Sequence, residues 1–209
     1  TFEGVQARVR TPVVTQLLGD SRPEIVLGER VFTHDGTPLW DAGLDPDELH
    51  PAVFAAVADL DGDGDPEVVF SAGDALVIHD HDGNRLYTSW LPGGGYAGPP
   101  AIMDVDGDGR LDVAVATGGT LAVLDRTGLA RWSALTNDRS GVAGVSGFDL
   151  DADGAMELLY ADEAALRIFD GRTGELRYAT ASHQSDTGVE YPLAADVDLP
   201  AAPRTPRAL

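Results

Sequence analysis

The stretch that decides the fold is DVDGDGRLDV, residues Asp104 to Val113, in which aspartates alternate with other residues and glycines follow closely. Two similar stretches are DLDGDGDPEV, residues Asp59 to Val68, and DLDADGAMEL, residues Asp149 to Leu158. Carboxylates this close to one another repel unless a counter-charge lies between them. Two alternatives follow: three solvated acidic turns, or three loops that each hold a cation.

These stretches recur at an even spacing. Asp59, Asp104 and Asp149 are 45 residues apart, and a partial copy begins 47 residues later at Asp196. A fixed period of this size indicates a repeat architecture. After each acidic stretch come two short apolar runs and a turn containing glycine, as in ELLYADE followed by ALRIFDGRTGE, residues 157–175.

The apolar runs predict β-hairpins, because they are short, rich in Val, Ile and Leu, and bounded by Asp-Gly or Thr-Gly turns. No run keeps a 3.6-residue period long enough for a helix. With the strand before each acidic loop, a repeat holds four strands, which is typical of a β-propeller blade. The chain is therefore predicted to be all-β. The predicted blades are residues 11–50, 51–96, 97–140 and 141–190, with a partial copy at 191–198 and a disordered tail at 199–209.

A large aromatic residue recurs near the end of each repeat, at Trp40, Trp90, Trp132 and Tyr178. A residue that returns at one position of every copy is typical of packing between neighbouring repeats. We therefore expect each of these rings to be buried between two blades rather than to form a surface for a ligand.

Composition excludes several classes of protein. The 209 residues carry a formal net charge of -21, and 43% of them are hydrophobic. An acidic chain of this kind repels nucleic acid and anionic membrane surfaces, so neither is an expected partner. No apolar run is long enough to cross a bilayer, and no cysteine is present for disulfides or thiolate metal sites. The chain starts at Thr1 without a signal peptide, so a leader was removed, lies upstream or never existed.

The acidic loops are numbered by repeat: loop 2 (59–67), loop 3 (104–112) and loop 4 (149–157). Calcium takes six to eight oxygen ligands, and aspartates at alternate positions of a tight loop converge on one point. The side chains at positions one, three, five and nine, and the carbonyl at position seven, are the expected ligands. They belong to Asp59, Asp61, Asp63, Asp65 and Glu67; to Asp104, Asp106, Asp108, Arg110 and Asp112; and to Asp149, Asp151, Asp153, Ala155 and Glu157.

Other interpretations of the loops fit less well. An EF-hand needs glutamate at position twelve, where this chain has Phe70, Val115 and Tyr160. Magnesium prefers to keep several waters, and solvated turns do not explain why three loops keep one five-position pattern. We therefore expect three calcium ions. Loop 1 (16–24) has Gln16 and Leu18 at its first two ligand positions and is expected to bind none.

The repeated D-x-D-x-D-G-x-x-[DE] loop between strands resembles the FG-GAP/VCBS repeats of integrin α-chain propellers and of bacterial secreted and surface proteins. The resemblance covers roughly residues 11–198, although the motif that names the family is present only loosely, as GYAGPP at Gly95 to Pro100. It implies a propeller, usually of seven blades, with calcium in loops on one face. Four to five blades then make this chain a partial propeller or an open array.

The resemblance implies a non-catalytic module for binding or adhesion, acting on a protein or carbohydrate ligand. An extracellular or cell-surface location is expected, with the periplasm as an alternative, because extracellular calcium fills weak oxygen sites. The alternative function is the propeller part of a calcium-dependent polysaccharide lyase similar to rhamnogalacturonan lyases. No catalytic triad or phosphate-binding loop is visible. His79 and His81 form either a transition-metal site or, as the neighbouring repeats favour, a hairpin tip.

Overall fold

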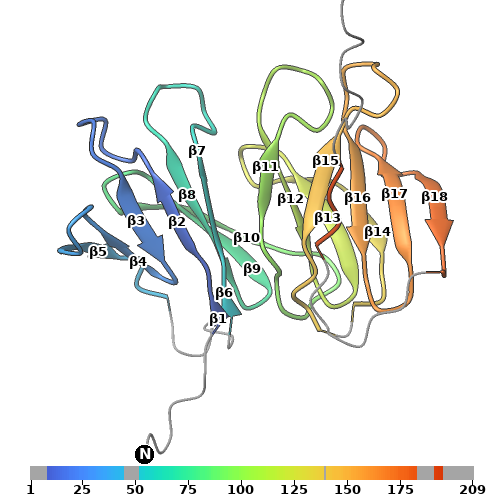
Figure 1. Ribbon diagram of the computed structural model, residues 1–209, viewed down its shortest axis with the longest axis horizontal. Coiled ribbons are helices and arrows are strands. Elements are labelled where there is room, and N and C mark those ends of the chain that lie inside the picture. The colour runs from blue at the N-terminus through green and yellow to red at the C-terminus, as the bar shows by residue number, and fades with distance from the viewer. Residues whose placement is uncertain (1–8, 45–51, 139, 183–190, 195–209) are drawn as a thin grey trace, which may run out of the picture.

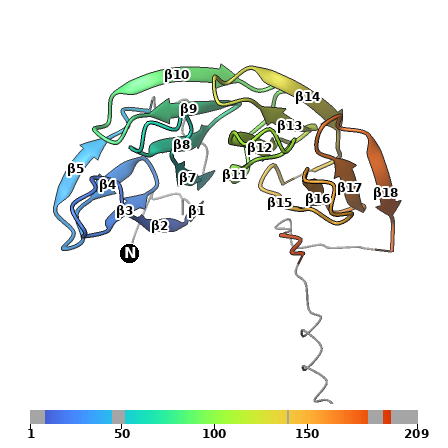
Figure 2. The same ribbon diagram turned by 90° about the horizontal axis from the view of Figure 1, so that it is seen from above.

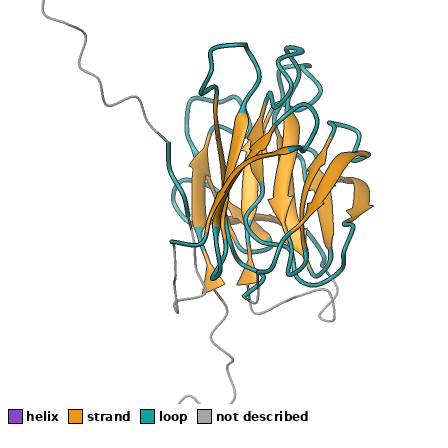
Figure 3. Ribbon diagram, turned by 90° about the vertical axis from the view of Figure 1, so that its right-hand side faces the viewer, coloured by secondary structure: helices purple, strands orange, loops and turns teal. Residues whose placement is uncertain are grey.

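The computed structural model describes residues 9–44, 52–138, 140–182 and 191–194, and these contain strands and loops but no helix (Figures 1 and 3). Sixteen of the strands form four antiparallel sheets of four, and each sheet uses consecutive strands in up-and-down order. The prediction of an all-β chain of four-stranded units is confirmed. The predicted partial copy beyond Ala194 and the predicted disordered tail at 199–209 lie outside the described residues.

We call the sheets blades 1 to 4. Blade 1 contains β2 (Pro12–Thr15), β3 (Glu24–Leu27), β4 (Arg30–Phe32) and β5 (Pro38–Asp41). Blade 2 contains β7 (Ala55–Ala58), β8 (Glu67–Ala72), β9 (Ala75–His79) and β10 (Arg85–Trp90). Blade 3 contains β11 (Ala101–Met103), β12 (Asp112–Ala116), β13 (Thr120–Leu124) and β14 (Ala130–Leu135). Blade 4 contains β15 (Val145–Phe148), β16 (Glu157–Ala161), β17 (Leu166–Asp170) and β18 (Leu176–Thr180). A short parallel pair joins β1 (Val9–Arg10) to β6 (Ala52–Val53).

The blades follow one another around an open arc, with blades 1 and 4 at its two ends (Figure 2). The first strand of each blade, β2, β7, β11 and β15, lies on the inner side of the arc, and the last strand lies on the outer side. This is the radial arrangement of propeller blades, here as a part of a ring.

The core lies between blades rather than within one sheet. On β8, Val68 and Phe70 pack in the cluster shared with blade 1, whereas Val69 packs in the cluster shared with blade 3. On β12, Val113 faces blade 2 and Ala114 faces blade 4. Successive side chains of a strand point to opposite faces, so a strand buried on both faces needs a continuous apolar run. The runs seen in the sequence are these central strands.

One aromatic side chain in each of blades 1, 2 and 3 packs against the next blade, but the expected residue of blade 2, Trp90, is wrong. Trp40, Tyr87, Trp132 and Tyr178 occupy equivalent places, each opposite a branched residue of the preceding strand and beside a register shift. Trp90 lies three residues beyond Tyr87 at the end of β10 and is 69% exposed. The register of the β9–β10 pair therefore places Tyr87 in blade 2 where the other blades have Trp40, Trp132 and Tyr178. We call these four residues the repeat aromatics.

The contact that these aromatics make is the same at each blade boundary. Trp40 Nε1 donates to His81 O at 3.1 Å, and Trp132 Nε1 donates to Gly171 O at 2.7 Å. Each ring also covers a turn glycine of the next blade; a Cβ on Gly174 would lie 2.5 Å from Trp132 Cε3. Tyr178 has no following blade among the described residues and is 51% exposed, so the prediction that it is buried is wrong here.

The loops that join the first and second strands of all four blades project from one edge of the arc, at the top of Figure 1. The turns between the third and fourth strands lie beside them, since Arg126 of such a turn in blade 3 donates to Asp61 O in blade 2 at 3.1 Å. All three acidic loops are therefore at one edge.

Candidate metal centres

The backbone of the acidic loops is left-handed at positions four and six. In loop 2 these positions are Gly62 (φ 83°) and Gly64 (φ 102°), and loop 3 has glycines at the same places. Loop 4 keeps the conformation with Ala152 (φ 61°) at position four. Only glycine adopts this conformation without a steric cost, so the glycines of the motif are needed for the sharp turn.

The first aspartate of each loop is held by backbone donors. Asp59 accepts hydrogen bonds from Gly62 N at 2.7 Å and from Gly64 N at 3.0 Å. Asp104 and Asp149 accept bonds from the same positions of their own loops or from the residue next to them. These bonds orient the carboxylate toward the loop interior.

A buried acid at position nine closes the loop. Glu67 is 5% exposed, and its Oε2 accepts a hydrogen bond from Leu60 N at 2.8 Å. Burial, together with the charges of the neighbouring aspartates, raises the pKa of Glu67. Glu24 of loop 1 accepts the equivalent bond from Leu17 N at 2.8 Å. Because loop 1 lacks the aspartates at positions one and three, this glutamate has a structural role that is independent of metal.

Asp112 occupies position nine of loop 3 and differs from the glutamates. It is fully buried, and neither carboxylate oxygen has a hydrogen bond of good geometry among the described residues. Burial raises its pKa to about 6, although the nearby Arg131 guanidinium opposes the change. A buried carboxylate without hydrogen bonds is costly unless a cation compensates it.

The loops bring carboxylate oxygens together in three groups whose ligand atoms lie within 4.8 Å of one another. The groups are Asp59, Asp61 and Glu67; Asp104, Asp106 and Asp108; and Asp149, Asp151 and Glu157. Nine of the twelve side-chain carboxylates predicted as ligands thus converge. Those outside the groups are Asp63, Asp112 and Asp153. Asp63 and Asp153 instead accept bonds from the backbone N at position seven, both at 2.9 Å.

Sequence reasoning missed the arginines at two of the loops. Arg131 forms ion pairs with Asp106, Asp108 and Asp112 of loop 3. Arg177 forms ion pairs with Asp151 and Glu157 of loop 4. Both stand directly before the repeat aromatic, and this shared position was the signal available in the sequence.

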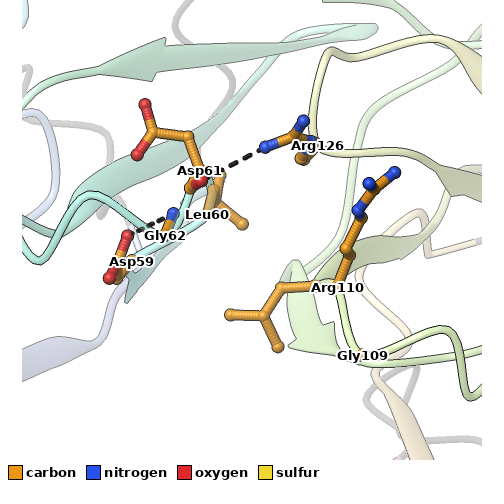
Figure 4. A pocket seen from close by; sticks show the side chains of 8 residues that line it. Asp59, Leu60, Asp61, Gly62, Gly109, Arg110 and Arg126 are labelled. Carbon is orange, nitrogen blue, oxygen red and sulfur yellow. Dashed lines mark hydrogen bonds between the residues drawn. The ribbon is translucent and has the colours of Figure 1, made fainter.

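A pocket of about 240 Å³ lies between loops 2 and 3 (Figure 4). Asp59 and Asp61 form one wall, and Arg110 and Arg126 form the other. Its volume is below that of sites for drug-sized ligands. The pocket therefore marks a polar contact between adjacent blades rather than a separate substrate site.

The two histidines of blade 2 do not act together. His79 is buried in the blade interface, where its ring stacks on Trp40 with centroids 5.8 Å apart, and burial lowers its pKa. His81 lies in the turn and its Nε2 is 3.5 Å from Asp82. This arrangement corresponds to a packing residue and a hairpin tip, which is the interpretation that the neighbouring repeats favoured.

The fold and the loops define the class of protein: part of a β-propeller with acidic loops at one edge. Residues 59–115 match the model of the FG-GAP-like repeat, which confirms the resemblance for this part of the chain. This segment contains loops 2 and 3 and the strands between them. No curated protein sequence matches the chain.

Solved structures with the same fold include three of different function. The V. cholerae biofilm matrix protein Bap1 is 16% identical with a TM-score of 0.73, over 89% of this chain and 57% of that chain. Rhamnogalacturonan lyase YesW is 16% identical with a TM-score of 0.60, over 83% and 42%. An Agrocybe aegerita lectin specific for terminal N-acetylglucosamine is 13% identical with a TM-score of 0.51, over 82% and 52%. The chain thus spans about half the length of these relatives, and the similarity shows the fold alone.

Proposed function

We propose that this chain is a non-catalytic calcium-binding propeller module that acts outside the cytoplasm in binding or adhesion. The observation that carries the proposal is the convergence of carboxylate oxygens in loops 2, 3 and 4 at one edge of the arc. Carboxylate and carbonyl oxygens in a flexible loop suit calcium, a hard cation with high coordination number.

In each loop the residues that would hold calcium are the acids at positions one, three, five and nine and the carbonyl at position seven. The carbonyls are those of Asp65, Arg110 and Ala155. Asp63 and Asp153 would contribute through the oxygen that is not already bonded to the backbone N at position seven. The three ions, one in each loop, would supply the positive charge that offsets the repulsion among the thirteen carboxylates of the loops.

A location outside the cytoplasm agrees with the chemistry of the loops, because extracellular calcium is high enough to fill sites of modest affinity. Within the described residues, no helix is long and apolar enough to cross a membrane. The partner in our proposal is a protein or a carbohydrate. The lectin that recognises terminal N-acetylglucosamine shares the fold and supports a carbohydrate as the partner, and the biofilm matrix protein Bap1 shares the fold as well.

The alternative is the propeller part of a polysaccharide lyase, which similarity to rhamnogalacturonan lyase YesW favours. Cleavage would need a free basic side chain in a cleft. Arg131 and Arg177 are instead in ion pairs with acidic residues, and Arg110 and Arg126 line only the small pocket between loops 2 and 3. Incubation of the chain with a uronic-acid polymer tests this alternative. Loss of the polymer, measured by the absorbance of the unsaturated product, would support the lyase.

Calorimetric titration of the metal-free chain with calcium tests the proposal. We expect three bound ions, with loop 1 binding none, and Asp106→Ala should reduce the number to two because each loop lies within its own blade. Each site filled at a hundredfold excess over Kd stabilises the fold by about 2.7 kcal/mol. Chelation with EGTA should therefore lower Tm, and magnesium should restore it only in part. An unchanged melting curve in EGTA would show that the loops are only solvated turns.

A further inference from the structure

Two arginines occupy the same repeat position, directly before the repeat aromatic, and both reach an acidic loop of their own blade. Arg131 on β14 contacts Asp106 of loop 3, 25 residues away in sequence, and its Nε lies 2.9 Å from Asp112 Oδ1. Arg177 on β18 contacts loop 4 through Nη1, at 2.7 Å from Asp151 Oδ2 and 2.6 Å from Glu157 Oε1.

Loop 2 has no such partner. Leu86 stands before Tyr87 in blade 2, and no carboxylate of loop 2 forms an ion pair with an arginine in the part of the chain that the structure describes. Arg126 approaches this loop, but it donates to the backbone carbonyl of Asp61 at 3.1 Å and not to a carboxylate. Loop 2 also carries a fifth acid, Asp65 at position seven, whereas loops 3 and 4 carry four acids each.

Loop 4 carries a second guanidinium. Arg172 Nη1 lies 2.5 Å from Asp153 Oδ2, and its Nη2 donates to Asp153 O at 3.2 Å. Arg177 is also anchored to Asp170 in the turn beside the loop. The three loops therefore differ in how many arginines form ion pairs with their carboxylates: none in loop 2, one in loop 3 and two in loop 4.

We propose that Arg131 and Arg177 are tethered counter-cations that compete with calcium, so that the three loops bind it in the order loop 2, loop 3, loop 4. This inference rests on the proposed calcium binding and concerns the differences between its sites. The buried Asp112, whose only cationic neighbour is Arg131 among the described residues, shows that loop 3 uses such a cation in the folded chain.

The physical basis is competition for the same oxygens. Calcium needs carboxylate oxygens at about 2.3 to 2.6 Å, and a guanidinium already hydrogen-bonded to them must leave or be repelled. Displacing an arginine breaks more than one partly exposed ion pair, which weakens calcium binding about tenfold. When calcium is lost, the arginines still neutralise part of the negative charge of loops 3 and 4. The carboxylates of loop 2 then have no ion-paired arginine among the described residues.

The test compares calcium binding by the whole chain and three variants in calorimetric titrations. Arg131→Gln removes the tethered cation of loop 3, and Leu86→Arg places one beside loop 2. Arg30→Gln is the matched control, because Arg30 pairs with Asp41 in blade 1, away from the acidic loops. We expect one tight and two weaker ions in the unmodified chain, two tight ions in Arg131→Gln, and a tight phase weakened about tenfold in Leu86→Arg. Arg30→Gln should leave all three Kd values unchanged.

Melting in EGTA gives a second readout that does not depend on calcium. Arg131→Gln should lower Tm by about 2–4 °C, because the acids of loop 3 lose their counter-charge, and Leu86→Arg should raise it. Calcium binding with the same three Kd values in every variant would overturn this inference and leave the proposed function intact. No calcium binding by any variant would overturn both.

Discussion

Replacing Trp132 with alanine should destabilise the chain far more than the same replacement at Trp90. Trp132 is partly buried in the cluster between blades 3 and 4, where it donates to Gly171 O and lies 6.4 Å from the Phe169 ring. Its hydrogen bond contributes about 1 kcal/mol, the ring pair about 0.5–1.5 kcal/mol, and half-burial of the indole roughly 1.5 kcal/mol. The expected loss is about 3–4 kcal/mol, within the range for buried aromatic truncations.

Thermal unfolding followed by circular dichroism, in saturating calcium, measures the difference. A loss of 3–4 kcal/mol corresponds to a fall in Tm of roughly 10 °C for a chain of about 200 residues. Trp90→Ala is the matched control, because its ring is 69% exposed; the change there should stay within about 0.5 kcal/mol. Equal shifts for the two variants would refute the assignment of Trp132, and not Trp90, to the blade interface.

Two further predictions concern the loops. Ala152→Gly should raise the free energy of unfolding by about 0.5–1 kcal/mol in urea titrations, because Ala152 has φ 61°, whereas Gly64→Ala should lower it. A fall in stability of Ala152→Gly would contradict this. In EGTA, Asp112→Asn should raise Tm at neutral pH and have little effect near pH 4. Asp112 has a folded-state pKa raised to about 6, so its favourable contribution exists at low pH and is lost as pH rises through that value. A pH-independent effect would show that the Asp112 carboxyl does not titrate as its burial indicates.

The sequence alone predicted the architecture and the position of the loops. The 45-residue period, the hairpin turns and the continuous apolar runs such as Val113–Ala116 correspond to the blades and their two-sided central strands. Local chemistry was sufficient for this, since strand alternation and turn preference depend on neighbouring residues. It also separated loop 1 from the three acidic loops, because the missing aspartates at Gln16 and Leu18 can be seen directly.

Only the tertiary structure decided which aromatic belongs to the blade interface and what neutralises the loops. Trp90 matches its counterparts by residue type, but the β9–β10 register places Tyr87 in the equivalent position, and register depends on pairing across strands. Arg131 and Arg177 reach their loops across their own blades, over 20 or more residues of sequence. The sequence shows which residues are charged, whereas the folded sheet determines which oppositely charged residue each of them contacts.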